Sequence, residues 1–577
     1  MVNRRQALTV LASAGIGSAV FRRALAAKAA AGAVTPEMVA DAEWVAGIKL
    51  TADQRKAAVK SSRLYQEPNK RVRAIDLDNA RQPAFLFAPL ESAASRPDPR
   101  GYRSVAPPPH RSDPGPRPDA DEELAFASIR QLGAWLRSRS ISSVELTKLY
   151  LKRLNRYDPL LKCVVTFTED VALKQAKQAD RELAQNKDRG PLHGIPWGVK
   201  DIISYPGHPT TWGAPQYRQR IINVKAAVAE RLENAGAVLV AKLATNPFAG
   251  GGVQWYRGLT RTPWNPRMDA AGSSSGSGSA TGAGLVGFSI ATDTAGSIIN
   301  PSMRCGCVGI RPTYGRVSRY GCMQLCWSLD TVGPICRSAD DCGLVLAAIH
   351  GADPRDRASV DRPYVWPSSR DISTIRVGYA EHGKDKNGES LRVLRELGVK
   401  LVPIQKTKLL EDYGLTFELI EGVVAMEGAA SFDELTRRGE PKGVHGWPRY
   451  WAYGHLLSAV DYLKMNRLRA ILMERCAKLM QSIDVFVGFE LGLYTNLAGH
   501  PLLVMPVKFE KDHDFLMPRP QMMAGRTYDE STLLALADAY QRRIGLKERP
   551  PLEKFLAEKD QILKDEKLPD ENKLYTD

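Results

Sequence analysis

One lysine and two serines of this 577-residue chain have the types and surroundings that nucleophilic catalysis needs. Lys200 follows Gly198-Val199, whereas Ser273 and Ser297 each lie in a stretch of Gly and small residues. A serine hydroxyl becomes nucleophilic when a neighbouring base takes its proton, and the tetrahedral intermediate then needs N–H donors aimed at its oxygen. The pattern predicts a serine hydrolase in which lysine replaces histidine as the base.

Ser274 supports a different hypothesis. Gly272-Ser273-Ser274-Ser275-Gly276 fits the GxSxG pattern of a nucleophile elbow, in which Ser274 would attack. That elbow needs a strand directly before the serine, but residues 263–269 contain two prolines and no alternation of apolar and polar side chains. The elbow is therefore the weaker interpretation.

Each motif taken alone also has a non-catalytic interpretation. Lys200 beside Asp201 is typical of a surface ion pair, and the run 272–284 has the composition of a Gly/Ser linker. The apolar segment 285–291 follows this run and leads directly into the second Gly/Ser loop. Two such loops on either side of one buried segment indicate that both belong to a packed core.

Helical and strand patterns alternate along most of the chain and have to position these residues. They predict a single large α/β domain with a central mixed β-sheet covered by helices on both faces, with Lys200 at the end of a short strand. The expected strands are 163–167, 195–200, 237–241, 375–379, 399–404 and 484–489, and the expected helices include 171–186, 226–235, 388–397 and 460–482.

The chain is expected to divide into four parts: 1–27 as a signal peptide, 28–123 as an N-terminal extension with a Pro/Arg-rich linker, 124–550 as the catalytic domain and 551–577 as a charged tail. Arg4-Arg5 before an apolar run favours twin-arginine export to the periplasm or cell envelope, with no stable membrane span after processing. Arg22-Arg23 leaves an uncleaved anchor or a chance basic start open, and without export the protein would be cytoplasmic.

Composition excludes several other classes of function. The net charge of +16 is spread along the chain without zinc-finger spacing or an aromatic-rich basic motif, so it predicts solvated basic surface and no nucleic-acid partner. Attraction to acidic envelope polymers remains an alternative. The nine histidines include no HExxH, and neither a metal nor another cofactor is expected. The eight cysteines fit buried thiols, although export would permit a disulfide within 322–342.

Together, the ordered motifs resemble the amidase signature family, over roughly residues 124–550. The matching segments are Gly194-Ile195-Pro196 with Val199-Lys200-Asp201, Ala271-Gly272-Ser273-Ser274-Ser275-Gly276-Ser277, Thr292-Asp293-Thr294-Ala295-Gly296-Ser297, residues 311–318, residues 328–334 and Asn496-Leu497-Ala498-Gly499-His500-Pro501. The resemblance implies the fold of that family and hydrolysis of a linear amide through an acyl-enzyme.

By position, the resemblance implies Ser297 as nucleophile and Lys200 as base. Ser273, expected to adjoin a cis peptide bond, would be the bridging serine. The implied oxyanion hole consists of the backbone amides of Thr294, Ala295 and Gly296, together with that of Ser297. A lysine serves as a base near neutral pH only where burial lowers its pKa from about 10.4.

Several positions depart from the family pattern. Ala271, Ser275 and Ala295 stand where glycine is usual, and a Cβ at Ala295 restricts the loop if φ is positive there. Ile299 replaces an arginine, and residues 484–489 are not followed by the usual Pro-Thr pair. These changes leave the three catalytic residues in place but weaken any inference about substrate.

The leading hypothesis is a hydrolase whose partner is a small-molecule amide, although an ester or carbamate hydrolase would use the same machinery. One alternative is the A subunit of a tRNA-dependent glutamine amidotransferase, and another is a catalytically degenerate binding protein. Substrate choice is expected in the stretch 405–480, where core packing is the competing explanation for the aromatic residues Trp447, Tyr450, Trp451, Tyr453 and Tyr462. The oligomeric state is not predicted.

Overall fold

The chain forms two compact units in the computed structural model. The smaller unit combines Met1–Pro83 with Glu411–Leu468, and the larger unit combines Ala84–Leu410 with Arg469–Asp577. The structure describes residues 34–75, 115–250, 254–380, 388–404, 409–413, 415, 417–439 and 447–564.

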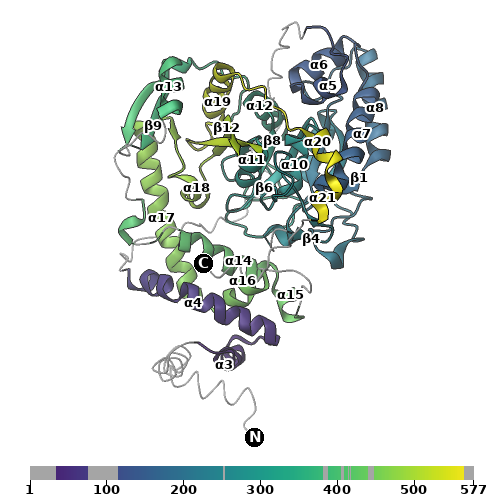
Figure 1. Ribbon diagram of the computed structural model, residues 1–577. Coiled ribbons are helices and arrows are strands. Elements are labelled where there is room, and N and C mark those ends of the chain that lie inside the picture. The colour runs from purple at the N-terminus through teal and green to yellow at the C-terminus, as the bar shows by residue number, and fades with distance from the viewer. Residues whose placement is uncertain are drawn as a thin grey trace, which may run out of the picture. The chain divides into compact units, whose positions relative to one another are not determined.

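The larger unit is built on an 11-stranded mixed sheet in the order β1-β3-β2-β6-β8-β7-β12-β13-β11-β9-β10. Its strands are β1 (Val164–Phe167), β2 (Pro196–Lys200), β3 (Val238–Leu243), β6 (Phe288–Asp293), β7 (Val308–Arg311), β8 (Thr331–Cys336), β9 (Arg376–Ala380), β10 (Lys400–Ile404), β11 (Val485–Val487), β12 (Leu502–Asp512) and β13 (Phe515–Gly525). Strand β2 is parallel to β3 and β6, whereas β8 is antiparallel to β6. Helices cover the sheet (Figure 1), and the predicted α/β fold class is confirmed.

The helices of this unit are α5 (Asp121–Phe126), α6 (Ile129–Arg137), α7 (Ser143–Leu161), α8 (Glu169–Ala184), α9 (Ala227–Asn234), α10 (Ser275–Gly282), α11 (Ile299–Cys305), α12 (Ala339–Ile349), α13 (Gly388–Glu396), α18 (Gly492–Ala498), α19 (Glu530–Ile544), α20 (Leu552–Ala557) and α21 (Lys559–Lys564). A short hairpin is formed by β4 (Gln254–Trp255) and β5 (Gly258–Leu259). Leu552, Phe555 and Ile562 are buried in the core cluster of α7 and β3. The folded unit therefore extends past the predicted start of the tail at 551.

The Gly/Ser run that resembles a linker forms helix α10. Glycine lowers helix propensity, so packing has to stabilise this helix. A Cβ at Gly276 would lie 2.3 Å from the amide nitrogen of Ala244 at the end of β3, and one at Gly282 would lie 2.3 Å from the carbonyl oxygen of Cys305 in α11. The glycines thus let α10 approach its neighbours at backbone distance, as the prediction of a packed core requires.

The smaller unit is helical. It contains α3 (Pro36–Ala46), α4 (Ala52–Ala74), α14 (Phe417–Ser431), α15 (Asp433–Arg437), α16 (Trp447–Gly454) and the first part of α17 (Ala459–Ser482). Buried Val39, Leu50 and Val59 of the N-terminal segment pack with Ala452 of α16. Residues 411–468 therefore group with the N-terminal extension, whereas the sequence places them inside a single domain at 124–550.

Aromatic residues of the stretch 405–480 mainly serve this helical packing. Trp451 is buried and its ring stacks on Phe432, with 4.5 Å between the ring centroids. Tyr453 is also buried, and the Tyr462 hydroxyl donates to Glu427. The side chains of Trp447 and Tyr450 lie outside the described part of the structure.

The predicted signal peptide also lies outside the described residues, so export remains a prediction. In the part of the chain that the structure describes, no helix is long and apolar enough to cross a membrane.

Replacing Gly276 with alanine is expected to destabilise the larger unit by about 1–3 kcal/mol, because the new methyl group meets backbone atoms that have no room to move. Thermal unfolding followed by circular dichroism measures the effect. Gly492→Ala is the matched control, since a Cβ at this helical glycine comes no closer than 3.9 Å to any atom. Equal melting temperatures for the two variants would contradict the proposed close packing of α10.

Candidate active site

Strand β2 carries Lys200 to the edge of the sheet where the parallel strands β2, β3 and β6 end. Its side chain is completely buried. The Lys200 Nζ atom lies 2.8 Å from Ser273 Oγ and 2.9 Å from Thr292 Oγ1, within hydrogen-bonding distance of both. The structure therefore brings two of the three predicted catalytic residues into direct contact and adds Thr292, which sequence reasoning did not single out.

Burial lowers the pKa of Lys200 to about 7, because the charged amine loses its hydration. The carboxylates of Asp293 and Asp330 act in the opposite direction and favour the charged form. A pKa near 7 means that a large fraction of Lys200 is neutral at physiological pH. The amine can then accept a proton from the Ser273 hydroxyl.

Asp201 is not the ion-pair partner of Lys200. Its Oδ1 atom lies 2.7 Å from Nζ of Lys242, and both side chains are completely buried. Its Oδ2 atom accepts the backbone N–H of Thr211 at 2.9 Å. The interpretation of Lys200-Asp201 as a surface ion pair is therefore wrong. Asp201 binds Lys242 of β3 and Thr211 in the loop after β2, and no carboxylate of the described residues forms an ion pair with Lys200.

The loop that carries Ser273 has a cis peptide bond between Gly272 and Ser273. The Ser273 carbonyl accepts the backbone N–H of Asn246 at 3.0 Å. Ser274, the serine of the elbow hypothesis, is fully buried, and its hydroxyl donates to the Thr292 carbonyl at 3.1 Å. The residues directly before Ser274 form no strand, so the elbow lacks the structural context it needs.

Asp293 organises the loop that carries Ser297. Its Oδ1 atom accepts the N–H of Gly296 at 2.8 Å, and its Oδ2 atom accepts the N–H of Ile298 at 2.7 Å. Gly296 has φ = 100°, a conformation that favours glycine, whereas Ala295 is not among the described residues with positive φ. The concern about a Cβ at Ala295 is therefore removed.

The hydrogen bond between Gly296 and Asp293 changes the expected oxyanion hole. An N–H that already donates to a buried carboxylate is a poor donor to a substrate oxygen. Of the four amides expected to form the hole, those of Thr294, Ala295 and Ser297 are the better candidates. This part of the site remains a prediction.

Ser297 is partly exposed and lies beside the loop of Ser273. Its carbonyl oxygen accepts the backbone N–H of Ser274 at 3.3 Å. Among the described residues, no hydrogen bond joins the hydroxyls of Ser273 and Ser297. Catalytic hydrogen bonds in unliganded enzymes are often long and shorten when substrate binds.

Two further residues hold the Ser297 loop, and sequence reasoning did not assign them a role. Nδ2 of Asn496 in α18 donates to Asp293 Oδ1 and to the Thr294 carbonyl, both at 2.9 Å. The Thr294 hydroxyl donates to Asp330 Oδ1 at 2.7 Å. Asn496 and Asp330 lie in motifs that carry the family resemblance. Their place in these motifs was the only sign in the sequence that they matter to the site.

The remaining side chains of the site do not form a metal centre. Within the described ranges, no group of three or more His, Cys, Asp or Glu residues is arranged to hold a metal ion. All eight cysteines are free thiols, so the optional disulfide within 322–342 is not formed in this structure.

Comparisons with known proteins identify the family of this chain. The family model described as Amidase matches residues 145–488. The A subunit of the glutamyl-tRNA(Gln) amidotransferase of Chloroflexus aurantiacus is 34% identical over 479 residues, which are 73% of this chain and 97% of the relative. The protein of the same name from Methylococcus capsulatus is 33% identical over 484 residues, or 74% of this chain and 98% of the relative.

Among solved structures, the native peptide amidase from Stenotrophomonas maltophilia is 26% identical and has a TM-score of 0.64. The match covers 74% of this chain and 99% of the peptide amidase. These matches cover almost the whole length of the relatives and leave about a quarter of this chain uncovered.

The rate of serine modification is expected to rise with pH through about 7. Lys200 accepts a proton only when it is neutral, and protonation below its pKa removes the base. The second-order rate constant for labelling of Ser297 by a fluorophosphonate, measured from pH 5 to pH 9, tests this expectation. A profile that stays flat between pH 6 and pH 8 would rule out Lys200 as the titrating base.

Asn496→Ala is expected to slow the labelling of Ser297 by about 10²-fold, because it removes the donor that fixes the Thr294 peptide and so misorients the following N–H. The matched control is Asn466→Ala, which removes a buried amide whose Nδ2 donates to the Tyr462 carbonyl in the helical unit. The two variants should have similar melting temperatures. Slower labelling of Asn496→Ala then results from a displaced Thr294 peptide and not from unfolding. Equal labelling rates for both variants would contradict a positioning role for Asn496.

Proposed function

Because the chain belongs to the amidase family, we propose that it cleaves the carbon–nitrogen bond of a linear amide by transferring the acyl group first to Ser297 and then to water. The observation that carries this proposal is the direct contact between the buried amine of Lys200 and the hydroxyl of Ser273. A desolvated lysine beside a serine is the arrangement that activates a hydroxyl nucleophile without histidine.

In the proposed reaction, neutral Lys200 accepts a proton from Ser273, and Ser273 accepts one from Ser297 as its oxygen attacks the amide carbonyl. Collapse of the tetrahedral intermediate breaks the carbon–nitrogen bond, and the same relay returns a proton to the leaving nitrogen. Water then attacks the acyl-enzyme and releases the acid. Amides of the Ser297 loop stabilise the oxyanion, and each donor is worth about 10²–10³ in rate.

The names of the curated relatives favour a second candidate function, the A subunit of a tRNA-dependent glutamine amidotransferase. The same acyl transfer would then act on the carboxamide of glutamine inside a larger assembly. Export through the signal predicted at 1–27 would separate the chain from aminoacyl-tRNA, which is cytoplasmic. The peptide amidase similarity is compatible with hydrolysis by the chain alone.

A fluorophosphonate is expected to label Ser297, and Lys200→Ala is expected to slow this labelling by about 10²–10⁴-fold through loss of the general base. Peptide mass spectrometry identifies the labelled residue. Ser274→Ala is the control and should retain labelling, since its hydroxyl is engaged with the Thr292 carbonyl. Labelling at Ser274 would restore the elbow hypothesis, and no labelling of folded protein would favour a degenerate binding protein.

Release of ammonia separates the two candidate enzymes. The purified chain is incubated with small carboxamides and, separately, with glutamine. Turnover of small amides without any added protein supports the hydrolase, whereas turnover of glutamine that requires co-purified partner proteins supports the amidotransferase.

A further inference from the structure

A second loop lies at the same edge of the sheet as the Ser297 loop. Strand β6 ends at Asp293 and the antiparallel strand β8 begins at Thr331, and these two residues are paired in the sheet. The segment before β8 and the segment after β6 therefore leave the sheet side by side. The bond from the Thr294 hydroxyl to Asp330 joins them, and Trp327 lies three residues before Asp330.

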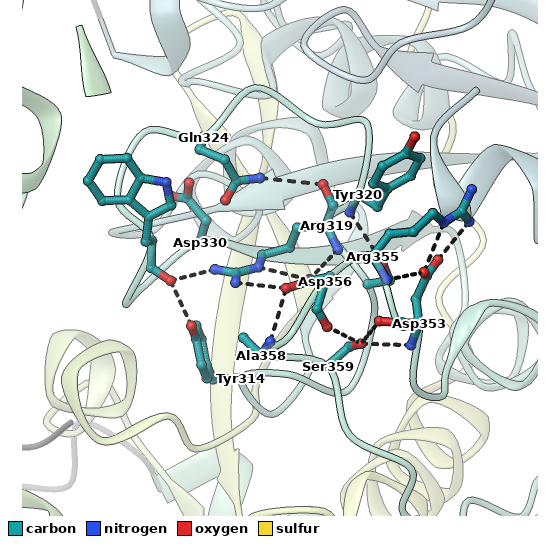
Figure 2. Close-up of polar contacts among 12 residues, drawn as sticks. Tyr314, Arg319, Tyr320, Gln324, Asp330, Asp353, Arg355, Asp356, Ala358 and Ser359 are labelled. Carbon is teal, nitrogen blue, oxygen red and sulfur yellow. Dashed lines mark hydrogen bonds and ion pairs between the residues drawn. The ribbon is translucent and has the colours of Figure 1, made fainter. Parts of the chain in front are cut away.

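Side chains from several segments form hydrogen bonds with the backbone around Trp327. Its carbonyl accepts hydrogen bonds from the Tyr314 hydroxyl at 2.6 Å and from Nη1 of Arg319. Arg319 is itself fixed by Asp356, as Figure 2 shows, with its Nε atom 3.1 Å from the Asp356 carboxylate. Oδ2 of Asp330 accepts the N–H groups of the two residues before Trp327, at 2.7 and 3.0 Å.

Arg469 connects this segment to the helix that supports the Ser297 loop. Its Nη2 atom donates to the Ser328 carbonyl at 2.8 Å, and its Nε atom donates to the Leu497 carbonyl in α18 at 2.6 Å. Helix α18 also carries Asn496, whose amide holds Asp293. The Trp327 segment and the nucleophile loop are thus parts of one hydrogen-bonded assembly.

The side chain of Trp327 nevertheless projects into solvent, with 45% of its surface exposed. A single exposed apolar residue needs no special explanation on most surfaces. Here the indole extends from a segment whose backbone four other side chains hold, and Asp330 of the same segment bonds Thr294 in the loop of the proposed nucleophile. An indole on a held backbone has only two side-chain torsions to order, so a flat group packs on it at a small cost in conformational entropy.

We propose that Trp327 is a specificity-determining residue that stacks on an aromatic ring of the substrate. This inference rests on the proposed function and specifies its substrate as an aryl-substituted amide. An aromatic ring of the substrate gains dispersion and quadrupole contacts with the indole.

Two fluorophosphonates of matched length, one ending in a phenyl ring and one in a linear alkyl chain, test the proposal on the full chain. Trp327→Ala is expected to lower the second-order labelling rate at Ser297 by about tenfold for the phenyl probe. For the alkyl probe the same variant should change the rate by less than about twofold. Trp327→Phe keeps an aromatic face and should retain the preference for the phenyl probe.

Val365→Ala is the control because it removes another exposed apolar side chain of the same unit, next to the start of α19. Equal losses for both probes in Trp327→Ala, or no loss for either, would overturn the inference and leave the proposed function standing. Absence of labelling by both probes in the unmodified chain would overturn the proposed function, and this inference with it.

Discussion

The desolvation of a single amine is the constraint on which the arrangement of this site depends. Moving the pKa of Lys200 from 10.5 to about 7 corresponds to roughly 5 kcal/mol against the charged form. Below pH 7 the folded state bears this whole penalty, because Lys200 is charged in both the folded and the unfolded chain. Between pH 7 and 10.5 the folded state holds fewer protons than the unfolded one, so the penalty fades as pH rises.

A low lysine pKa requires that nearby carboxylates be satisfied by other groups. Asp201 follows Lys200 directly but binds Lys242, and Asp293 accepts backbone amides and the Asn496 amide. Asp330 accepts backbone amides and the Thr294 hydroxyl, and burial raises its pKa to about 6. These carboxylates anchor loops, and Asp293 and Asp330 raise the pKa of Lys200 less than its burial lowers it.

The catalytic strand was predictable from sequence because its signals are local. A short apolar strand ends at Lys200, and burial of the neighbouring segments follows from their composition. The helix at 275–282 was not predictable, since its glycines oppose helix formation and only contact with β3 and α11 stabilises it. The role of Asn496 was hidden for a similar reason, because its partner Asp293 lies 203 residues away in the chain. The grouping of 411–468 with the N-terminal helices likewise depends on distant contacts.

Our proposals place bond cleavage and substrate selection in different segments of this chain. The proposed proton relay uses the end of β2 and loops that buried carboxylates anchor, and it contacts only the amide group of the substrate. In our proposal, specificity depends on segments such as that of Trp327, which the same anchors hold but which take no part in bond cleavage. A small polar substrate such as glutamine would leave this indole uncovered, whereas an aryl amide would bury it. Relatives can thus share the catalytic residues while their substrates differ, because the loops that contact substrate vary independently of the sheet that positions the nucleophile.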